Sequence, residues 1–409
     1  MKLLDFIRRH KLILLLIVAA ALYYPRFVNR PQGMDLYPRG AAALLRGEVL
    51  EDSVLGFNYP PVFAFVMIPF ALVRPWLRDL LWYLVLVGST CLSFRLCEHL
   101  TLKTWPEPLP RKELLWLRVL TLALSIKLVL AVFENQAYDA VVFLCVLIGL
   151  DGLARGKDLR AAAGLAAAAA LKVTPLLFFP YLLLRGRMKL FLLCVALYAG
   201  ISLLPDVFFT PSKSSSGYFV TWVHDMVGGL FIKNPAIYRP RQWDSANPLN
   251  ESLRSLVTHL TTGSSWSAHA STILNVVYLG YLSVMGALLI RSGKMARSFV
   301  LDGSVLLISM LMLSPMSSKS HFIVLMLPYM LLSAYVIKEE RFRWLGGIVL
   351  AVSFALNSLT AKQIMGRPLS EIFLSSGCIT IGTLILLVFL GHIIFERGKA
   401  SAEPCRAPS

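Results

Sequence analysis

The stretch Gly33–Pro61, GMDLYPRGAAALLRGEVLEDSVLGFNYPP, separates the first apolar segment of the chain from the second. Asp35 stands at the head of a helix-like run, Leu36 to Arg46, and a polar return stiffened by two prolines follows. If the N-terminus is cytoplasmic, this stretch lies on the outer face of a membrane. The other polar clusters with functional character are then expected on the same face.

Composition places the chain in a membrane. Hydrophobic residues fill 57% of 409 positions and the mean hydropathy is +0.67, whereas soluble domains are roughly 45–50% apolar. We predict an all-α, polytopic membrane protein with one domain, residues 1–396, and a cytoplasmic tail, 397–409. The outer loops 25–77 and 205–270 are expected to form its site. The net charge is +17, but Lys and Arg lie in short loops between apolar runs, so nucleic-acid binding is not expected.

The membrane topology follows from apolar length and from the basic residues of short loops. About twelve segments result, with both termini cytoplasmic and with Leu12 to Tyr24 as a retained first span. Val62 to Val73 is too short to cross and has Pro near both ends, so it is expected to be an interfacial or re-entrant helix. Counting it as a span would put the short basic loops outside.

A broken segment follows the fourth span. The Ala-rich run Ala161 to Leu171 stops at Lys172-Val-Thr-Pro175, and a short apolar descent, Leu176 to Leu184, continues it. Each limb is too short for the roughly 30 Å hydrocarbon core. We expect a bend at Lys172, in a thinned region or under a cavity that opens outward. The small residues before it predict close helix packing.

Asp35 is a candidate general base, because one carboxylate at the membrane surface can accept the proton of an attacking hydroxyl. The alternative is a helix cap, since Asp before a helix-like run is a good N-cap residue. The residues alone leave both roles open.

Two cations are candidates for anion binding. Lys172 lies in a broken helix and could contact a lipid phosphate, or its head could extend to the interface while its stem lies in lipid. His321 follows a Ser/Lys turn that opens a helix, where free N–H groups attract anions; an ordinary capped turn is the alternative. Lys127 is expected to be a second buried cation or the partner of Asp139.

Other polar residues could shape the pocket of an acceptor, notably Asn250 and Glu251 in the long outer loop. The six cysteines show no metal-ligand spacing, and no His pair suited to metal binding occurs. P-loop, Rossmann and Gly-x-Ser-x-Gly patterns are also absent from the sequence. We therefore expect neither a metal nor another cofactor.

Six motifs, taken in order, resemble the polyprenyl-phosphate-dependent glycosyltransferases of family 87, which have the GT-C membrane fold. The matching residues are Asp35-Leu-Tyr with Ala41 to Gly47, Asn58-Tyr-Pro-Pro with Pro69, Asn135-Gln136, Leu171-Lys-Val-Thr-Pro175, Asn250-Glu-Ser-Leu253, and Ser314-Pro-Met-Ser317 with His321. The resemblance implies an inverting, metal-independent transfer of a sugar from a lipid-phosphate carrier to a lipid or glycan acceptor. It implies Asp35 as the catalytic acid-base carboxylate.

The resemblance also assigns expected roles to the other residues. Lys172, His321 and Arg39 are expected to contact the donor phosphate. Contacts with the substrates are expected from Tyr59, Gln136, Asn250 and Glu251. The predicted protein is a bacterial inner-membrane enzyme that acts on the outer face with mannose as its sugar and arabinofuranose as the alternative. The rival class is a non-catalytic lipid flippase or assembly scaffold.

Overall fold

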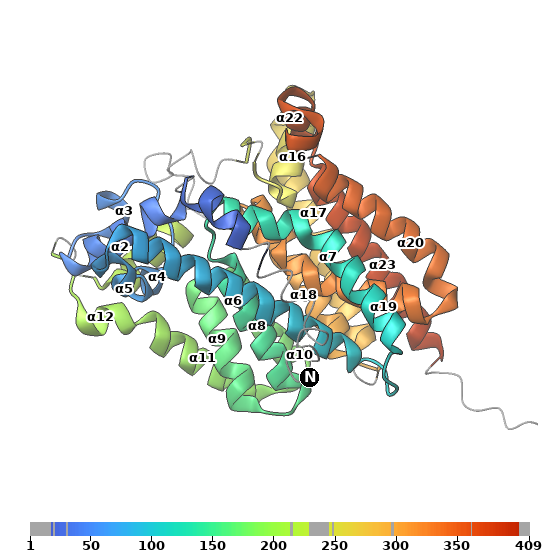
Figure 1. The fold of residues 1–409 in the computed structure, drawn as a ribbon. Helices are drawn as coiled ribbons and strands as arrows, with labels where there is room; N and C mark the ends of the chain where they lie inside the picture. The colour runs from blue at the N-terminus through green and yellow to red at the C-terminus, as the bar shows by residue number, and fades with distance from the viewer. Residues whose placement is uncertain are drawn as a thin grey trace, which may run out of the picture.

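The structure is a computed structural model that describes residues 18, 21–29, 32–212, 216–228, 245–247, 249–295, 298–360 and 362–400. Within these ranges every regular element is a helix (Figure 1). The all-α prediction is therefore confirmed. Most of the predicted first span, Leu12 to Tyr24, lies outside the described residues.

The N-terminal half begins with short helices and continues with long ones. The short helices of the first outer loop are α2 (Gly33–Leu45), α3 (Leu50–Ser53), α4 (Pro61–Val66) and α5 (Ile68–Leu72). The following elements are α6 (Pro75–Leu102), α7 (Arg111–Glu134), α8 (Asp139–Ala154), α9 (Asp158–Leu171), the 3-10 helix η1 (Thr174–Leu177), α10 (Phe178–Leu184) and α11 (Met188–Ser202).

In the described part of the long loop 205–270, which is predicted to be outer, the helices are short, and the C-terminal part of the chain returns to apolar ones. The loop holds α12 (Leu204–Phe208), α13 (Tyr218–Trp222), the π-helix η2 (Val223–Gly228), α16 (Leu253–Thr261) and η3 (Ser267–His269). The rest of the chain forms α17 (Ala270–Ser292), α18 (Phe299–Leu313), η4 (Lys319–Leu325), α19 (Met326–Lys338), α20 (Glu340–Phe354), η5 (Ala355–Leu359), α21 (Lys362–Met365), α22 (Arg367–Ser375) and α23 (Cys378–Ala400).

The described helices include six that are long and apolar enough to cross a membrane. They are Pro75–Leu102, Arg111–Glu134, Ser267–Ser292, Lys319–Lys338, Glu340–Leu359 and Cys378–Gly398. Three shorter apolar helices accompany them, Thr174–Leu184, Met188–Ser202 and Phe299–Leu313. The count of twelve segments stays a prediction, as does the division of the chain at residue 396.

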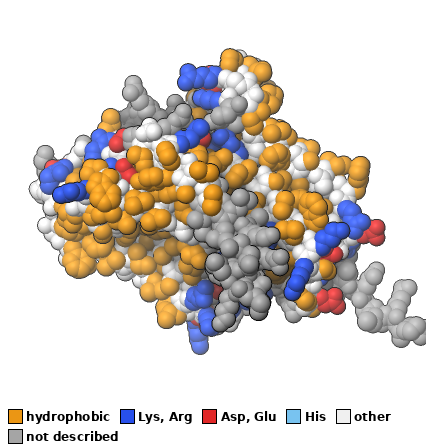
Figure 2. All heavy atoms as spheres, in the orientation of Figure 1, with side chains coloured by type: hydrophobic (Ala, Val, Ile, Leu, Met, Phe, Trp, Pro, Cys, Tyr) orange, Lys and Arg blue, Asp and Glu red, His pale blue; other side chains and the backbone are white. Residues whose placement is uncertain are grey.

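The outer surface of the helices is apolar. Trp344, Val388 and Leu279 are 82%, 74% and 67% exposed although they lie on candidate spans. Figure 2 shows hydrophobic side chains over most of the visible face, with Lys and Arg gathered towards its margins. Because a soluble protein rarely exposes so continuous an apolar surface, this surface is typical of contact with lipid.

Two predictions about short segments can be compared with the structure. The stretch Val62 to Val73 forms two helices, α4 and α5, rather than a single interfacial one, and Met67 separates them. Pro69, in the first turn of α5, has no N–H to continue α4, which explains the division. The expected break after Ala161 to Leu171 is confirmed, because Lys172 leaves the helix with φ of −153° and ψ of 129°.

Close packing of the Ala-rich segment is confirmed too. In α9, Ala161, Ala162 and Ala168 are fully buried. A Cβ on Gly164 would lie 2.5 Å from the backbone nitrogen of Gly149 in α8. The two backbones therefore approach too closely for any side chain between them, as small residues permit in lipid.

We expect Gly164→Ala to destabilise the protein by about 1–3 kcal/mol, because backbone atoms of α8 cannot move away as a side chain could. Gly200, in α11, is the matched control, since a Cβ there would meet nothing within 4 Å. Gly200→Ala should leave the melting temperature in detergent unchanged or slightly raised. Equal melting temperatures for the two variants would contradict the close approach.

Candidate active site

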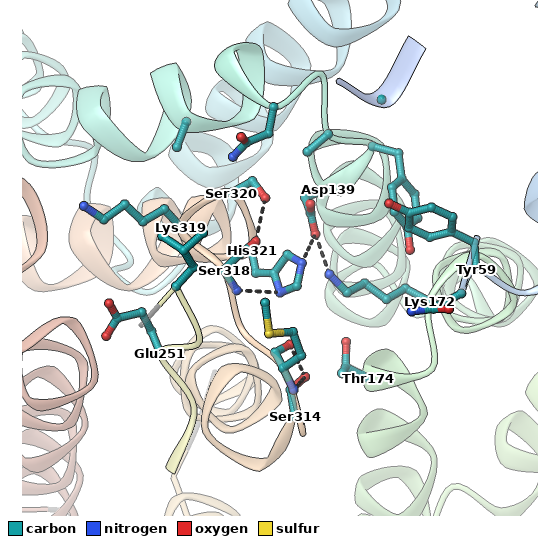
Figure 3. A pocket seen from close by; sticks show the side chains of 18 of the residues that line it. Tyr59, Asp139, Lys172, Thr174, Glu251, Ser314, Ser318, Lys319, Ser320 and His321 are labelled. Carbon is teal, nitrogen blue, oxygen red and sulfur yellow. Dashed lines mark hydrogen bonds and ion pairs between the residues drawn. The ribbon is translucent and has the colours of Figure 1, made fainter. Parts of the chain in front are cut away.

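A cavity of about 940 Å³ lies where the first outer loop, the α7–α8 turn, the break after α9 and the Ser314–His321 segment meet. The first outer loop contributes residues of α2 and of the Asn58–Pro60 turn, and the long outer loop contributes Leu249 and Glu251. The cavity is thus built largely from the short segments that the sequence places between apolar helices. Figure 3 shows the polar side chains that project into it.

The cavity holds a polar cluster of Asp139, Lys172 and His321, which we call the Asp139 cluster. Lys172 Nζ donates to Asp139 Oδ1 at 2.6 Å, and His321 Nε2 lies 3.8 Å from the same oxygen (Figure 3). Asp139 is the first residue of α8, where the free N–H groups of the helix favour a negative charge. The side chains of Asp139 and Lys172 are only 6% and 17% exposed.

The break in the chain after α9 sets the position of Lys172. Pro175 lacks an N–H, and its ring would collide with the carbonyl of residue 171 in a continued helix. The helix therefore ends at Leu171, and Lys172 turns towards α8. Its ammonium also lies 5.9 Å from the centre of the Tyr138 ring. Of the two alternatives for Lys127, the structure favours the second buried cation: its side chain is 17% exposed and its ammonium lies 3.8 Å from Glu134, while Lys172 is the partner of Asp139.

His321 is oriented by its own turn. The backbone N–H of Ser318 donates to the ring nitrogen Nδ1 of His321 at 3.3 Å, and the backbone N–H of His321 donates to the Ser318 carbonyl at 2.9 Å. Because Nδ1 accepts a hydrogen bond, the neutral ring carries its proton on Nε2, which faces Asp139. The capped turn is therefore present. His321 also lines the cavity, and its contact with phosphate stays a prediction.

Glu251 and Lys319 also line the cavity and lie to one side of the Asp139 cluster in Figure 3. Glu251 is 1% exposed, and neither of its carboxyl oxygens has a hydrogen-bond partner. Burial raises the pKa of this carboxyl to about 8, although the charge of Lys319 acts in the opposite direction. Glu251 therefore carries its proton at neutral pH.

Asn250, the neighbour of Glu251, holds the long outer loop against the segment before η4. Its Nδ2 donates to the Pro315 carbonyl at 3.0 Å, and its Oδ1 accepts from Ser317 N at 3.1 Å. Glu251 N adds a bond of 2.7 Å to the Ser317 carbonyl. This arrangement makes Asn250 a positioning residue for Glu251, and its predicted contact with substrate stays a prediction.

Gln136 joins the α7–α8 turn to the start of the first outer loop. Its Oε1 accepts from Gln32 N and Met34 N, both at 2.9 Å, and its Nε2 donates to the Phe27 carbonyl at 3.0 Å. The residue is 1% exposed and has φ of 51°, a left-handed conformation that is costly for a side chain. The predicted substrate contact of Gln136 stays a prediction, but its amide already holds α2 in place.

Gln136→Ala is expected to lower the free energy of unfolding by about 3 kcal/mol, because three backbone groups, two of them buried, lose their partner. Gln136→Gly should lose about 1 kcal/mol less, since glycine adopts the left-handed conformation without strain. Thermal melting of the purified protein in detergent measures both variants. Melting temperatures equal to that of the wild type would contradict the structural role of this amide.

Asp35 and Arg39 lie on the exposed side of α2. Asp35 is in the first turn of the helix, and the Arg39 Nε donates to its carbonyl at 2.6 Å. Their neighbours Gly33, Leu36 and Tyr37 line the cavity. Asp35 is therefore next to cavity-lining residues in sequence, but it is exposed and is not itself among the lining residues. The N-cap position belongs to Gln32, so the alternative role of Asp35 as the cap is wrong.

Tyr59 lines the cavity within an aromatic cluster, and its predicted contact with substrate stays a prediction. Its ring lies 5.4 Å from that of Tyr37 and 5.2 Å from that of Tyr138, both nearly perpendicular to it. Burial raises the pKa of Tyr59 to about 12. The phenol therefore stays protonated and can donate or accept a hydrogen bond.

The central position of Asp139 was missed by sequence reasoning. The sequence did place Asp139 among the charges at the ends of apolar helices, which are usually paired or functional. Its partners Lys172 and His321 were each singled out on other grounds. All three residues were expected on the same face of the membrane. This shared position was the signal that could have indicated their contact.

The sequence profile of glycosyltransferase family 87 matches residues 57–315. Two solved structures are similar in fold, ArnT from Cupriavidus metallidurans bound to undecaprenyl phosphate and the same protein in the apo state. Both are 12% identical, over 95% of this chain and 78% of theirs, with TM-scores of 0.40 and 0.42. A search of curated protein sequences finds no match. Because the family profile spans well over half of it, the chain belongs to glycosyltransferase family 87.

Proposed function

We propose that this membrane glycosyltransferase moves a sugar from a polyprenyl-phosphate carrier to an acceptor on the outer face of a bacterial inner membrane. Two features support the proposal together: membership in family 87, and a cavity that combines apolar walls with the cations Lys127, Lys172 and Lys319. The bound undecaprenyl phosphate of ArnT is in keeping with such a carrier. Family membership favours an enzyme over a flippase or scaffold.

The proposed reaction is a single inverting displacement. Asp35 accepts the proton of the acceptor hydroxyl while the oxygen forms its bond to the anomeric carbon. The bond from that carbon to the phosphate oxygen breaks, and the electron pair leaves with the polyprenyl phosphate. Fixed positive groups and N–H donors stabilise the growing charge. We propose the Lys172 ammonium and the His321 Nε2–H for these roles, and both residues line the cavity.

The other predicted residues take secondary roles in this scheme. Tyr59 and Glu251 line the cavity and can hydrogen-bond to a sugar. Arg39 would contact the phosphate only if the headgroup reached the exposed side of α2. The transferred sugar is proposed to be mannose, and arabinofuranose is the alternative. No cofactor is needed for the displacement as written.

The test is transfer by purified, reconstituted protein. Radiolabelled polyprenyl-phosphate mannose is added with host lipid extract, and both free polyprenyl phosphate and labelled acceptor are measured. Release together with label transfer supports the proposal. Transfer from the arabinose-charged donor alone would support the alternative sugar. Failure of folded protein with both donors would contradict a polyprenyl-phosphate-dependent transferase.

A further inference from the structure

The carboxyl group of Glu251 is held rigidly inside the cavity without a partner of its own. The backbone N–H of Glu251 donates to the Ser317 carbonyl at 2.7 Å, and the backbone carbonyl of Glu251 accepts from Thr380 Oγ1 at 2.8 Å. These bonds fix the backbone between η4 and α23. The side chain lines the cavity, and both of its oxygens are buried without a hydrogen bond.

An unpaired buried carboxyl is costly, and native proteins satisfy the great majority of such groups. The titratable groups that interact electrostatically with it come from other elements: Lys319 from η4 and Cys378 from α23. Lys127 and Glu134 of α7 act on Lys319 in turn, and Lys362 of α21 also lines the cavity. None of the described residues satisfies the carboxyl, which leaves its hydrogen-bonding capacity available to a ligand.

The ligand class follows from the protonated state of Glu251. A neutral carboxyl offers one donor and one acceptor side by side, which matches the hydroxyl groups of a sugar ring. A phosphate fits less well, because the group would lose its proton and repel the anion at higher pH. The Asp139 cluster, with Lys172 and His321, lies apart from the Glu251 carboxyl in Figure 3 and suits the phosphate better.

We infer that Glu251 is a specificity-determining residue whose neutral carboxyl binds ring hydroxyls of a sugar, either the donor's sugar or that of a glycan acceptor. The inference rests on the proposed function and adds to it a separate sugar subsite. A site built to hydrogen-bond a hydroxyl discriminates strongly against an analogue that lacks it, because the buried group is then left unpaired.

Two variants test this subsite. Glu251→Gln keeps a donor and an acceptor without titrating, and Glu251→Ala removes both. For the wild type we expect the KM of the sugar-bearing substrate to rise about tenfold from pH 7 to pH 9, since about one carboxyl in eleven stays protonated at pH 9 when the pKa is about 8. Glu251→Gln should show a flat KM over this range, and Glu251→Ala a KM raised about tenfold or more at pH 7. The control is Glu48→Gln, an exposed carboxylate paired with Arg46.

The readouts separate the two sources of sugar and the two proposals. A change confined to the donor KM assigns the subsite to the donor sugar, and a change confined to the acceptor KM assigns it to the acceptor.

Binding of polyprenyl phosphate with and without mannose, measured by thermal shift, needs no turnover: Glu251→Ala should remove the extra affinity due to a bound donor sugar. Two results together would overturn the inference. The KM of Glu251→Gln would depend on pH as that of the wild type does, and Glu251→Ala would keep both the wild-type KM values and the extra affinity due to the sugar. Wild-type protein that neither transfers nor binds polyprenyl phosphate would instead overturn the proposed function.

Discussion

Asp35→Asn is expected to lower the rate of sugar transfer by about 10²–10⁴-fold, the usual contribution of a positioned general base. The asparagine amide has the shape of the carboxylate but cannot accept the proton of the acceptor hydroxyl. The loss should appear in kcat, with little change in the donor KM, since Asp35 acts in the transition state. The measurement is transfer of radiolabel by reconstituted protein.

Folding should be unaffected by this substitution. Asp35 is exposed, and the hydrogen bond from Arg39 reaches its backbone carbonyl rather than its carboxylate. The melting temperature and the affinity for polyprenyl phosphate should therefore equal those of the wild type. Glu48→Gln, in the same outer loop, is the control for removal of one exposed negative charge and should keep full activity. Undiminished transfer by Asp35→Asn would show that another group accepts the proton.

Local rules of chain geometry allowed much of the fold to be predicted. The length of apolar runs predicted the helical class, and the Pro175 position predicted the break at Lys172, because proline ends a helix through its own ring and missing N–H. The turn around Asn135 is also local, and α7 and α8 indeed stop and start beside it. The division of Val62 to Val73 into two helices has an equally local cause in Pro69. The length of the apolar run, from which a single helix was predicted, does not register this proline.

The pairing within the site could not be predicted to the same degree. Residues 104 and 102 positions apart supply the hydrogen bonds that Gln136 Oε1 accepts. Lys172 and Asp139 are 33 positions apart. Contacts at such separations depend on how whole helices pack, and no periodicity in the sequence encodes them. The sequence therefore identified charged residues that were expected to be paired or functional. Which of them contact one another follows only from the packing of the folded chain.

Lys172→Gln is the second substitution with a large expected effect, and it acts on two quantities at once. Binding of polyprenyl phosphate should weaken about 10–100-fold, because a hydrogen bond to a charged group contributes about 1.5–3 kcal/mol. The free energy of unfolding should fall by about 3 kcal/mol, since Asp139 stays buried without its main partner. Isothermal titration with a short-chain polyprenyl phosphate and thermal melting measure the two effects.

The partner substitution separates phosphate binding from stability. Asp139→Asn also breaks the buried pair and should destabilise the protein, but it frees Lys172 from a competing negative charge, so the phosphate should bind a few-fold more tightly. The double variant, Lys172→Gln with Asp139→Asn, leaves no unpaired charge of this pair and should recover much of the stability while binding stays weak. If recovered stability also restored phosphate affinity, Lys172 would act only by holding Asp139 and α8 in place. Opposite effects of the two single variants on affinity, with similar losses of stability, would establish that the ammonium contacts the phosphate.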